Sequence, residues 1–179
     1  MRAAVERPEL VERARRHDPD AWEILYRAVY PRLAAFAARR VGRDRAGDVV
    51  SETMARAVAS IGRFDAEGTG FDAWLFGICR HVVADTHRHT VRHDRRRSPA
   101  APVVDDIADR LERDEEAAAM RAAYARLSDD DRELLDLRVV AGLSADDVAT
   151  VLGRQPGTVR MAQARATQRL RTHFGEVYR

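Results

Sequence analysis

The sequence predicts an all-α protein of two small helical domains joined by a flexible linker. Aromatic residues make up only 6% of the 179 residues, and long strand-like alternations of Val, Ile and Thr do not occur. Apolar residues instead recur at helical spacing in both halves of the chain. The halves are separated by residues 95–102, where three arginines precede two prolines, and proline interrupts helices.

The N-terminal half is expected to form three helices. The first begins at a cap near Asp20 and ends near Gly42, and the second runs from about Ala46 to Ile61. A glycine-containing loop, 62–70, precedes a third helix that starts near Phe71 and continues into a basic end.

The C-terminal half is expected to form at least three more helices, the first over residues 117–127. We place the first domain at 1–94, the linker at 95–112 and the second domain at 113–179.

The last two helices have the spacing of a helix-turn-helix. Ser144 and Asp147 fit a capping box, and Gly153 fits the left-handed residue that ends a helix. Pro156 fits the first turn of the next helix. Two short helices joined by so tight a turn are typical of DNA-binding proteins.

The outer face of the final helix is basic, and no acidic residue occurs between Arg154 and Phe174. Such a face suits the major groove, with its first turns at base edges and its arginines at phosphates. A solvated helical hairpin with a charged outer side is the alternative.

A second basic surface is expected on the third helix, which carries Arg80, His81, His87 and Arg88 opposite its apolar stripe. Phe64 lies in the preceding loop. Basic side chains beside an aromatic ring suit single-stranded nucleic acid, because the charges neutralise phosphates while the bases stack. The alternative for Phe64, as for Trp74, is core packing.

Composition excludes several classes of protein. The single Cys79 rules out a disulfide framework and a Cys-based zinc site, and no cofactor or metal is expected. Residues 1–10 lack the apolar run of a signal peptide, and no stretch is long enough to span a bilayer, so we expect a cytoplasmic protein. All 31 basic residues are Arg, which suits phosphate and guanine contacts, but composition alone favours GC-rich coding as the cause.

Three segments resemble the extracytoplasmic-function (ECF) group of the sigma-70 family, and the likeness covers nearly the whole chain. Residues 44–53 are similar to the family's polymerase-binding segment, and 71–81 to its Phe-x-x-Trp-Leu-x-x-Ile-Ala-Arg-Asn motif. The final helix pair, through 157–160, is similar to the family's C-terminal motif. The resemblance implies a non-enzymatic subunit that binds core RNA polymerase, through its β and β′ subunits, and promoter DNA in double- and single-stranded form.

The resemblance also assigns roles to residues. The set expected to grip the polymerase clamp coiled coil is Asp48, Glu52 and Arg56. The set expected at the minus-10 element, with Phe64 and His81 around a flipped base and the arginines at phosphates, is Phe64, Arg80, His81, Arg88 and Arg92. The set expected at the minus-35 duplex is Arg154, Thr158, Arg160, Met161, Ala164 and Arg165.

The sequence departs from the family pattern at positions that read bases. His81 replaces the usual Asn, Gln163 stands where an apolar residue is common, and Met161-Ala162 replaces Ser-Arg. The sequence shows neither an acidic inhibitory N-terminal region nor an extra C-terminal domain. We therefore expect that an anti-sigma factor regulates the protein. Two alternatives are a stand-alone helix-turn-helix regulator and an enzyme that uses His81 and Asp85.

Overall fold

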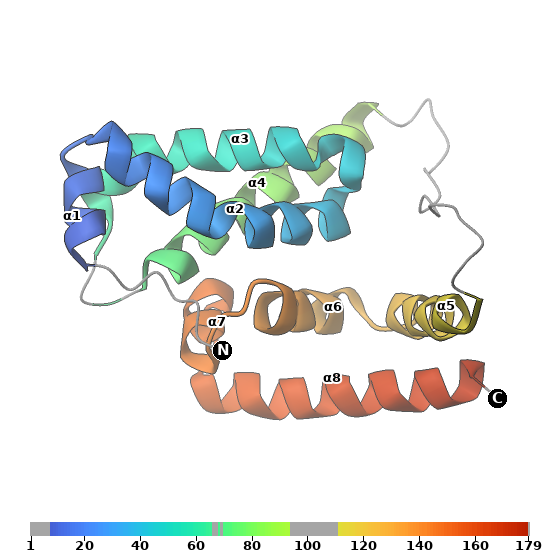
Figure 1. The fold of residues 1–179 in the computed structure, drawn as a ribbon. Coiled ribbons are helices and arrows are strands. Elements are labelled where there is room, and N and C mark those ends of the chain that lie inside the picture. Colours follow the sequence, from blue (N-terminus) through green and yellow to red (C-terminus); the bar gives the residue numbers. More distant parts are fainter. Residues whose placement is uncertain (1–7, 66–67, 69, 94–110, 179) are drawn as a thin grey trace.

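A computed structural model describes residues 8–65, 68, 70–93 and 111–178, and within these ranges every regular element is a helix (Figure 1). The all-α prediction is confirmed. The elements of the first lobe are α1 (Pro8–Arg15), α2 (Pro19–Val41), α3 (Arg43–Ser60), the short 3-10 turn η1 (Ile61–Arg63) and α4 (Phe71–His93). The elements of the second lobe are α5 (Leu111–Ala125), α6 (Asp129–Leu135), the π-helical turn η3 (Asp136–Val140), α7 (Ala145–Leu152) and α8 (Pro156–Val177).

The start of α2 differs from the prediction. Asp18, not Asp20, is the cap, because its Oδ1 accepts hydrogen bonds from the backbone N–H groups of Asp20 (3.0 Å) and Ala21 (3.3 Å). Pro19 occupies the first helical position, where a missing N–H costs nothing. Helix α1, which the sequence pattern does not predict, packs against α2, and Trp22 Nε1 donates to the carbonyl of Ala14 at 3.1 Å.

Helices α2, α3 and α4 surround an apolar core that fixes the surfaces discussed below. The rings of Phe36 and Phe76 meet edge to face at 5.6 Å, and Leu25 and Leu33 are almost completely buried beside them. The apolar stripe predicted on α4 therefore faces inward, and its basic residues are left on the outside.

The second lobe confirms the helix-turn-helix. Ser144 and Asp147 form the expected capping box, Gly153 has φ +62°, and Pro156 begins α8. In the preceding segment the backbone widens into the π turn η3, which brings the carboxylate of Asp136 inside, where it is 2% exposed.

The two lobes are packed against each other, as Figure 1 shows for α4 above α7. One continuous core contains residues of both lobes; the second lobe contributes Leu134, Leu137, Ala141, Leu143, Val148, Ala149 and Val159. The sequence predicted two domains on a linker but not this contact. Most of the predicted linker lies outside the described residues, and α5 already begins at Leu111.

Candidate nucleic-acid interfaces

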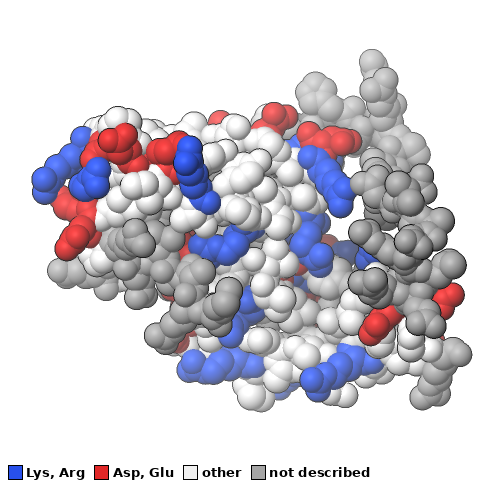
Figure 2. All heavy atoms as spheres, viewed as in Figure 1, with Lys and Arg blue, Asp and Glu red and all other residues white. Residues whose placement is uncertain are grey.

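Helix α8 presents the face that the sequence predicted for duplex DNA. Its inward side is anchored by Val159 and Ala166, both completely buried. All six residues predicted for the minus-35 duplex are exposed, and Met161 is 58% exposed, unusually high for a large apolar side chain. Figure 2 shows basic side chains along α8 at the lower edge of the molecule.

Two arginines of this face are already paired with acidic residues of other helices. Arg154 lies 3.2 Å from Asp130, and Arg160 lies 3.7 Å from Asp146. Arg165, in contrast, makes no hydrogen bond or ion pair with any residue in the described ranges. Among the three arginines predicted for the minus-35 duplex, Arg165 is therefore the most available to a base edge or phosphate.

Gln163 has a structural partner. Its Oε1 accepts a hydrogen bond from Nε of Arg138 at 2.8 Å, and Arg138 also donates to the carbonyl of Leu143. This network ties α8 to η3 and to the turn before α7. The polar residue at a commonly apolar position is thus explained by Arg138 opposite it.

Helix α4 exposes the second predicted surface. The carbonyl of Gly77 lies 2.8 Å from Nδ1 of His81, so Nδ1 donates there and neutral His81 offers Nε2 as an acceptor. Arg88 pairs with Asp85, while Arg80 Nε donates to Glu133 of the second lobe at 3.0 Å. Arg92 lies in α4, but its side chain is outside the described residues.

Phe64 lies in the core, unlike the exposed ring that base stacking requires. It is 4% exposed, and its ring centroid lies 5.0 Å from that of Trp74 and 6.1 Å from that of Phe71. In this conformation the alternative of core packing describes Phe64, because the rings of Trp74 and Phe71 exclude solvent from it. A base could reach Phe64 only if the loop moved.

The residues predicted to bind polymerase lie on the outer side of α3. Asp48 and Glu52 are exposed, and Arg56 donates to Glu52 at 2.7 Å and to Asp85 at 2.9 Å. Asp85 thereby joins α3 to α4, and its hydrogen bonds with Arg56 and Arg88 lower the pKa of its carboxyl. Asp85 is thus held by two arginines and His81 by the carbonyl of Gly77, and the structure shows no hydrogen bond between Asp85 and His81.

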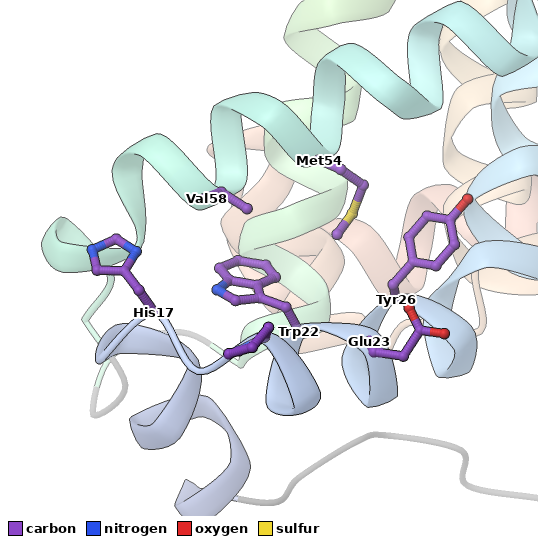
Figure 3. Close-up of a pocket in the computed structure, with 7 residues that line it drawn as sticks. His17, Trp22, Glu23, Tyr26, Met54 and Val58 are labelled. Carbon is purple, nitrogen blue, oxygen red and sulfur yellow. The ribbon is translucent and has the colours of Figure 1, made fainter.

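A shallow apolar pocket of about 390 Å³ opens between α2 and α3 (Figure 3). Trp22 and Tyr26 from α2 face Met54 and Val58 from α3 across it. In the sequence, Trp22 and Tyr26 keep the helical spacing of the apolar stripe of α2, and this pattern does not predict the pocket. The sequence feature that could have indicated the pocket is the position of both aromatic residues at the edge of that stripe, each next to a charged residue, Glu23 or Arg27.

The described residues were also compared with the requirements of a metal site and of a membrane span. No group of three metal-binding side chains is found there, and no helix in these ranges is long and apolar enough to cross a bilayer. Burial raises the pKa of the Cys79 thiol to about 11, which keeps it protonated.

Comparison with known proteins decides the family. The model for sigma-70 region 2 matches residues 25–93, and the model for sigma-70 region 4 matches 117–170. The ECF RNA polymerase sigma factor ShbA of Streptomyces griseus is 33% identical over 175 residues, covering 90% of this chain and 92% of its own length. The chain belongs to the ECF RNA polymerase sigma factors.

Further relatives agree with this membership. The ECF sigma factor BldN of Streptomyces coelicolor is also 33% identical over 90% of this sigma factor, which spans 63% of BldN's length. SigD of Mycobacterium tuberculosis is 33% identical, over 86% of this chain and 77% of its own. The comparisons give no support to a stand-alone regulator, because the first half of the chain matches sigma-70 region 2.

Solved structures show the same architecture. CnrH in complex with the cytosolic domain of CnrY is 27% identical with a TM-score of 0.66, covering 91% of this chain and 93% of that one. RpoE of Bartonella quintana, in complex with the anti-sigma factor NepR, is 26% identical with a TM-score of 0.68, covering 86% and 96%. The α3 and α4 surfaces of the sigma factor therefore belong to region 2, and the α8 surface to region 4.

Proposed function

We propose that this sigma factor binds core RNA polymerase and directs initiation at specific promoters. The observation that carries the proposal is that one chain matches both sigma-70 region 2, which contains α4, and sigma-70 region 4, which contains most of α8. The proposed domain limits are 1–94 and 113–179, with the linker between them.

Region 4 is proposed to read the duplex at the minus-35 element. Helix α8 would lie in the major groove, with Thr158, Met161 and Ala164 toward base edges. The exposed Met161 and Ala164 favour contacts with thymine methyl groups. Arg165 would bind a guanine edge or a phosphate, and Arg154 and Arg160 would exchange their present carboxylate partners for phosphates.

Region 2 is proposed to hold the polymerase and the melted minus-10 strand. Asp48, Glu52 and Arg56 offer a mixed-charge surface to the clamp coiled coil. On the neighbouring helix, His81 would contact a flipped base, with Arg80, Arg88 and Arg92 at phosphates. The Arg56–Asp85–Arg88 chain of ion pairs supports this, because it holds the two surfaces in a fixed relation.

An anti-sigma factor is the proposed regulator, and the cytoplasm the proposed location. The similar sigma factor RpoE of Bartonella quintana is seen in complex with the anti-sigma factor NepR, which supports this proposal. The sigma factor is proposed to act as a polymerase subunit without catalytic chemistry of its own.

Run-off transcription with purified chain and Streptomyces core polymerase tests the proposal. Mapping transcript 5′ ends on genomic DNA should give starts that require the chain and share sequence elements upstream. Asp48→Arg should abolish these transcripts by blocking polymerase binding, whereas Glu116→Arg, on the exposed side of α5, should retain them. Tight, promoter-specific binding of the chain without polymerase would contradict the proposal.

A further inference from the structure

Three arginines of the first lobe donate hydrogen bonds to oxygen atoms of the second lobe. Arg39 of α2 places Nε 2.5 Å from Oδ1 of Asp136, and Arg80 of α4 places Nε 3.0 Å from Oε1 of Glu133. Arg32 donates to the carbonyl of Ala141 at 2.8 Å. In each of these pairs the first lobe supplies a guanidinium and the second lobe supplies an oxygen.

The acidic partners are well enclosed, whereas the arginines reach the surface. The side chains of Asp136 and Glu133 are 2% and 16% exposed, while those of Arg39 and Arg80 are 40% and 38% exposed. Tyr124 adds to the site, because the Arg39 guanidinium lies 4.2 Å from the centre of its ring. Burial raises the pKa of Tyr124 to about 12, so the Tyr124 hydroxyl stays protonated and the neutral ring packs against the Arg39 guanidinium.

Separation of the lobes would leave Arg39 and Arg80 without these partners. Arg32 would keep Asp72, in its own lobe, at 2.6 Å. Two guanidiniums on adjoining helices would then face solvent, and such a pair suits an anionic backbone because each planar fork can bind a phosphate through two hydrogen bonds. Arg80 already belongs to the surface proposed for the minus-10 strand, and Arg39 extends that surface across α2.

Promoter binding demands such separation. A folded chain of 179 residues has a radius of gyration of about 16 Å. Elements named for positions minus-10 and minus-35 are centred about 25 base pairs apart, which is about 85 Å along straight B-DNA. The docked lobes therefore cannot contact both elements at once.

We propose that Arg39 and Arg80 form one phosphate-binding strip for single-stranded promoter DNA, and that Asp136 and Glu133 occupy it while the lobes are docked. Lobe docking and DNA binding by the first lobe then exclude each other. The proposal rests on the proposed function for the identity of the DNA, but its test needs no polymerase and no promoter. Failure in transcription and failure in this test are thus separate results.

The test measures binding of the full chain to a fluorescein-labelled 20-nucleotide oligothymidylate, as a probe of backbone contacts alone. The double variant Glu133→Gln/Asp136→Asn removes the competing carboxylates and should bind about 3- to 10-fold more tightly than the matched control Glu115→Gln/Glu116→Gln. The control makes the same charge change at exposed positions of α5. Equal affinity of the two double variants would overturn the proposal.

Arg39 is tested in the same assay. Adding Arg39→Gln to the carboxylate variant should remove most of the gain and lower the slope of log K against log salt by about 0.7, one phosphate contact on a single strand. An unchanged slope would remove Arg39 from the strip. Circular dichroism checks folding; if the double variant loses helix, Glu133→Gln alone is compared with Glu115→Gln.

A distance measurement tests mutual exclusion directly. Spin labels at Ser51→Cys on α3 and Thr172→Cys on α8 occupy exposed positions in different lobes, and the native Cys79 is buried. The free chain should give one short distance, and saturating oligothymidylate should replace it with longer ones. An unchanged distance in the bound chain would show that docking and binding coexist and would overturn the proposal.

Discussion

The Nε atom of Arg39 lies 2.5 Å from the Oδ1 atom of Asp136, although 97 positions separate the two residues along the chain. The pair joins α2 of region 2 to the π turn of region 4. Since Asp136 is 2% exposed, its charge depends on this arginine for compensation.

Arg39→Met should therefore destabilise the folded chain by about 1–2 kcal/mol, less than a fully buried pair would lose, because Arg39 itself is 40% exposed. Urea unfolding followed by circular dichroism measures the change. Arg27→Met is the control, since Arg27 pairs with Glu23 at the surface, and it should stay within about 0.5 kcal/mol of the parent. A loss no greater than that of the control would mean that Asp136 does not depend on Arg39.

Acid stability should depend on Asp131. Hydrogen bonds from Arg169, at 2.7 and 2.8 Å, lower the pKa of this carboxyl below its unfolded value. Its contribution is therefore complete above the unfolded pKa, about 3.9, and is lost as the pH falls through the lower folded pKa. Asp131→Asn should lower stability at pH 7 and flatten the fall below about pH 4. Urea midpoints across pH measure this against Glu116→Gln, and a parallel shift at every pH would contradict it.

Gln163→Leu should cost about 1 kcal/mol, because Arg138 would lose its acceptor in a half-buried position. Gln163→Glu keeps an acceptor for Arg138 and should retain stability. Thermal unfolding compares the two with Gln168→Leu, an exposed position on the same helix. Equal stability of the Gln163→Leu and Gln163→Glu variants would mean that the hydrogen bond from Arg138 does not stabilise the fold.

Arg165→Ala should weaken recognition of the minus-35 element by about 1–3 kcal/mol if the guanidinium binds a base edge in two places. Competition between specific and scrambled duplexes, measured with the polymerase holoenzyme, gives the change in preference. Arg121→Ala, at an exposed position of α5, is the control. Equal weakening on both duplexes would assign Arg165 to a phosphate.

His81→Asn should shift base preference within the minus-10 element, because an amide offers both a donor and an acceptor where neutral His81 offers Nε2 alone. Transcription from a library randomised at that element reads out the preference. His17→Asn, at an exposed position between α1 and α2, should leave it unchanged. The same preference in both variants and the parent would exclude His81 from base contact.

Local chemistry explains why most helices could be predicted from the sequence. The Ser144 capping box, the left-handed Gly153 and the N-terminal Pro156 each act within a few residues, so their pattern predicts the helix-turn-helix directly. The predicted cap of α2 at Asp20 is wrong because Pro19 favours the first helical position and so indicates the residue before it, Asp18.

Long-range packing could not be predicted in this way. Nothing in the spacing of Arg39 or Asp136 indicates that they meet, because the contact depends on how two separately patterned lobes dock. Phe64 shows the same limit, since its place among Phe71 and Trp74 depends on the path of the loop. The residues that contact polymerase and DNA remain predictions that the experiments above address.

Because one continuous core joins the two lobes, we expect them to unfold together. Leu137 and Val148 are fully buried within a cluster that also contains Leu33 and Phe76. Heating should therefore melt both lobes in a single cooperative transition. Opening without a partner would expose this apolar surface to solvent and to proteases, so we expect proteolysis of the free chain to follow the population of the open form.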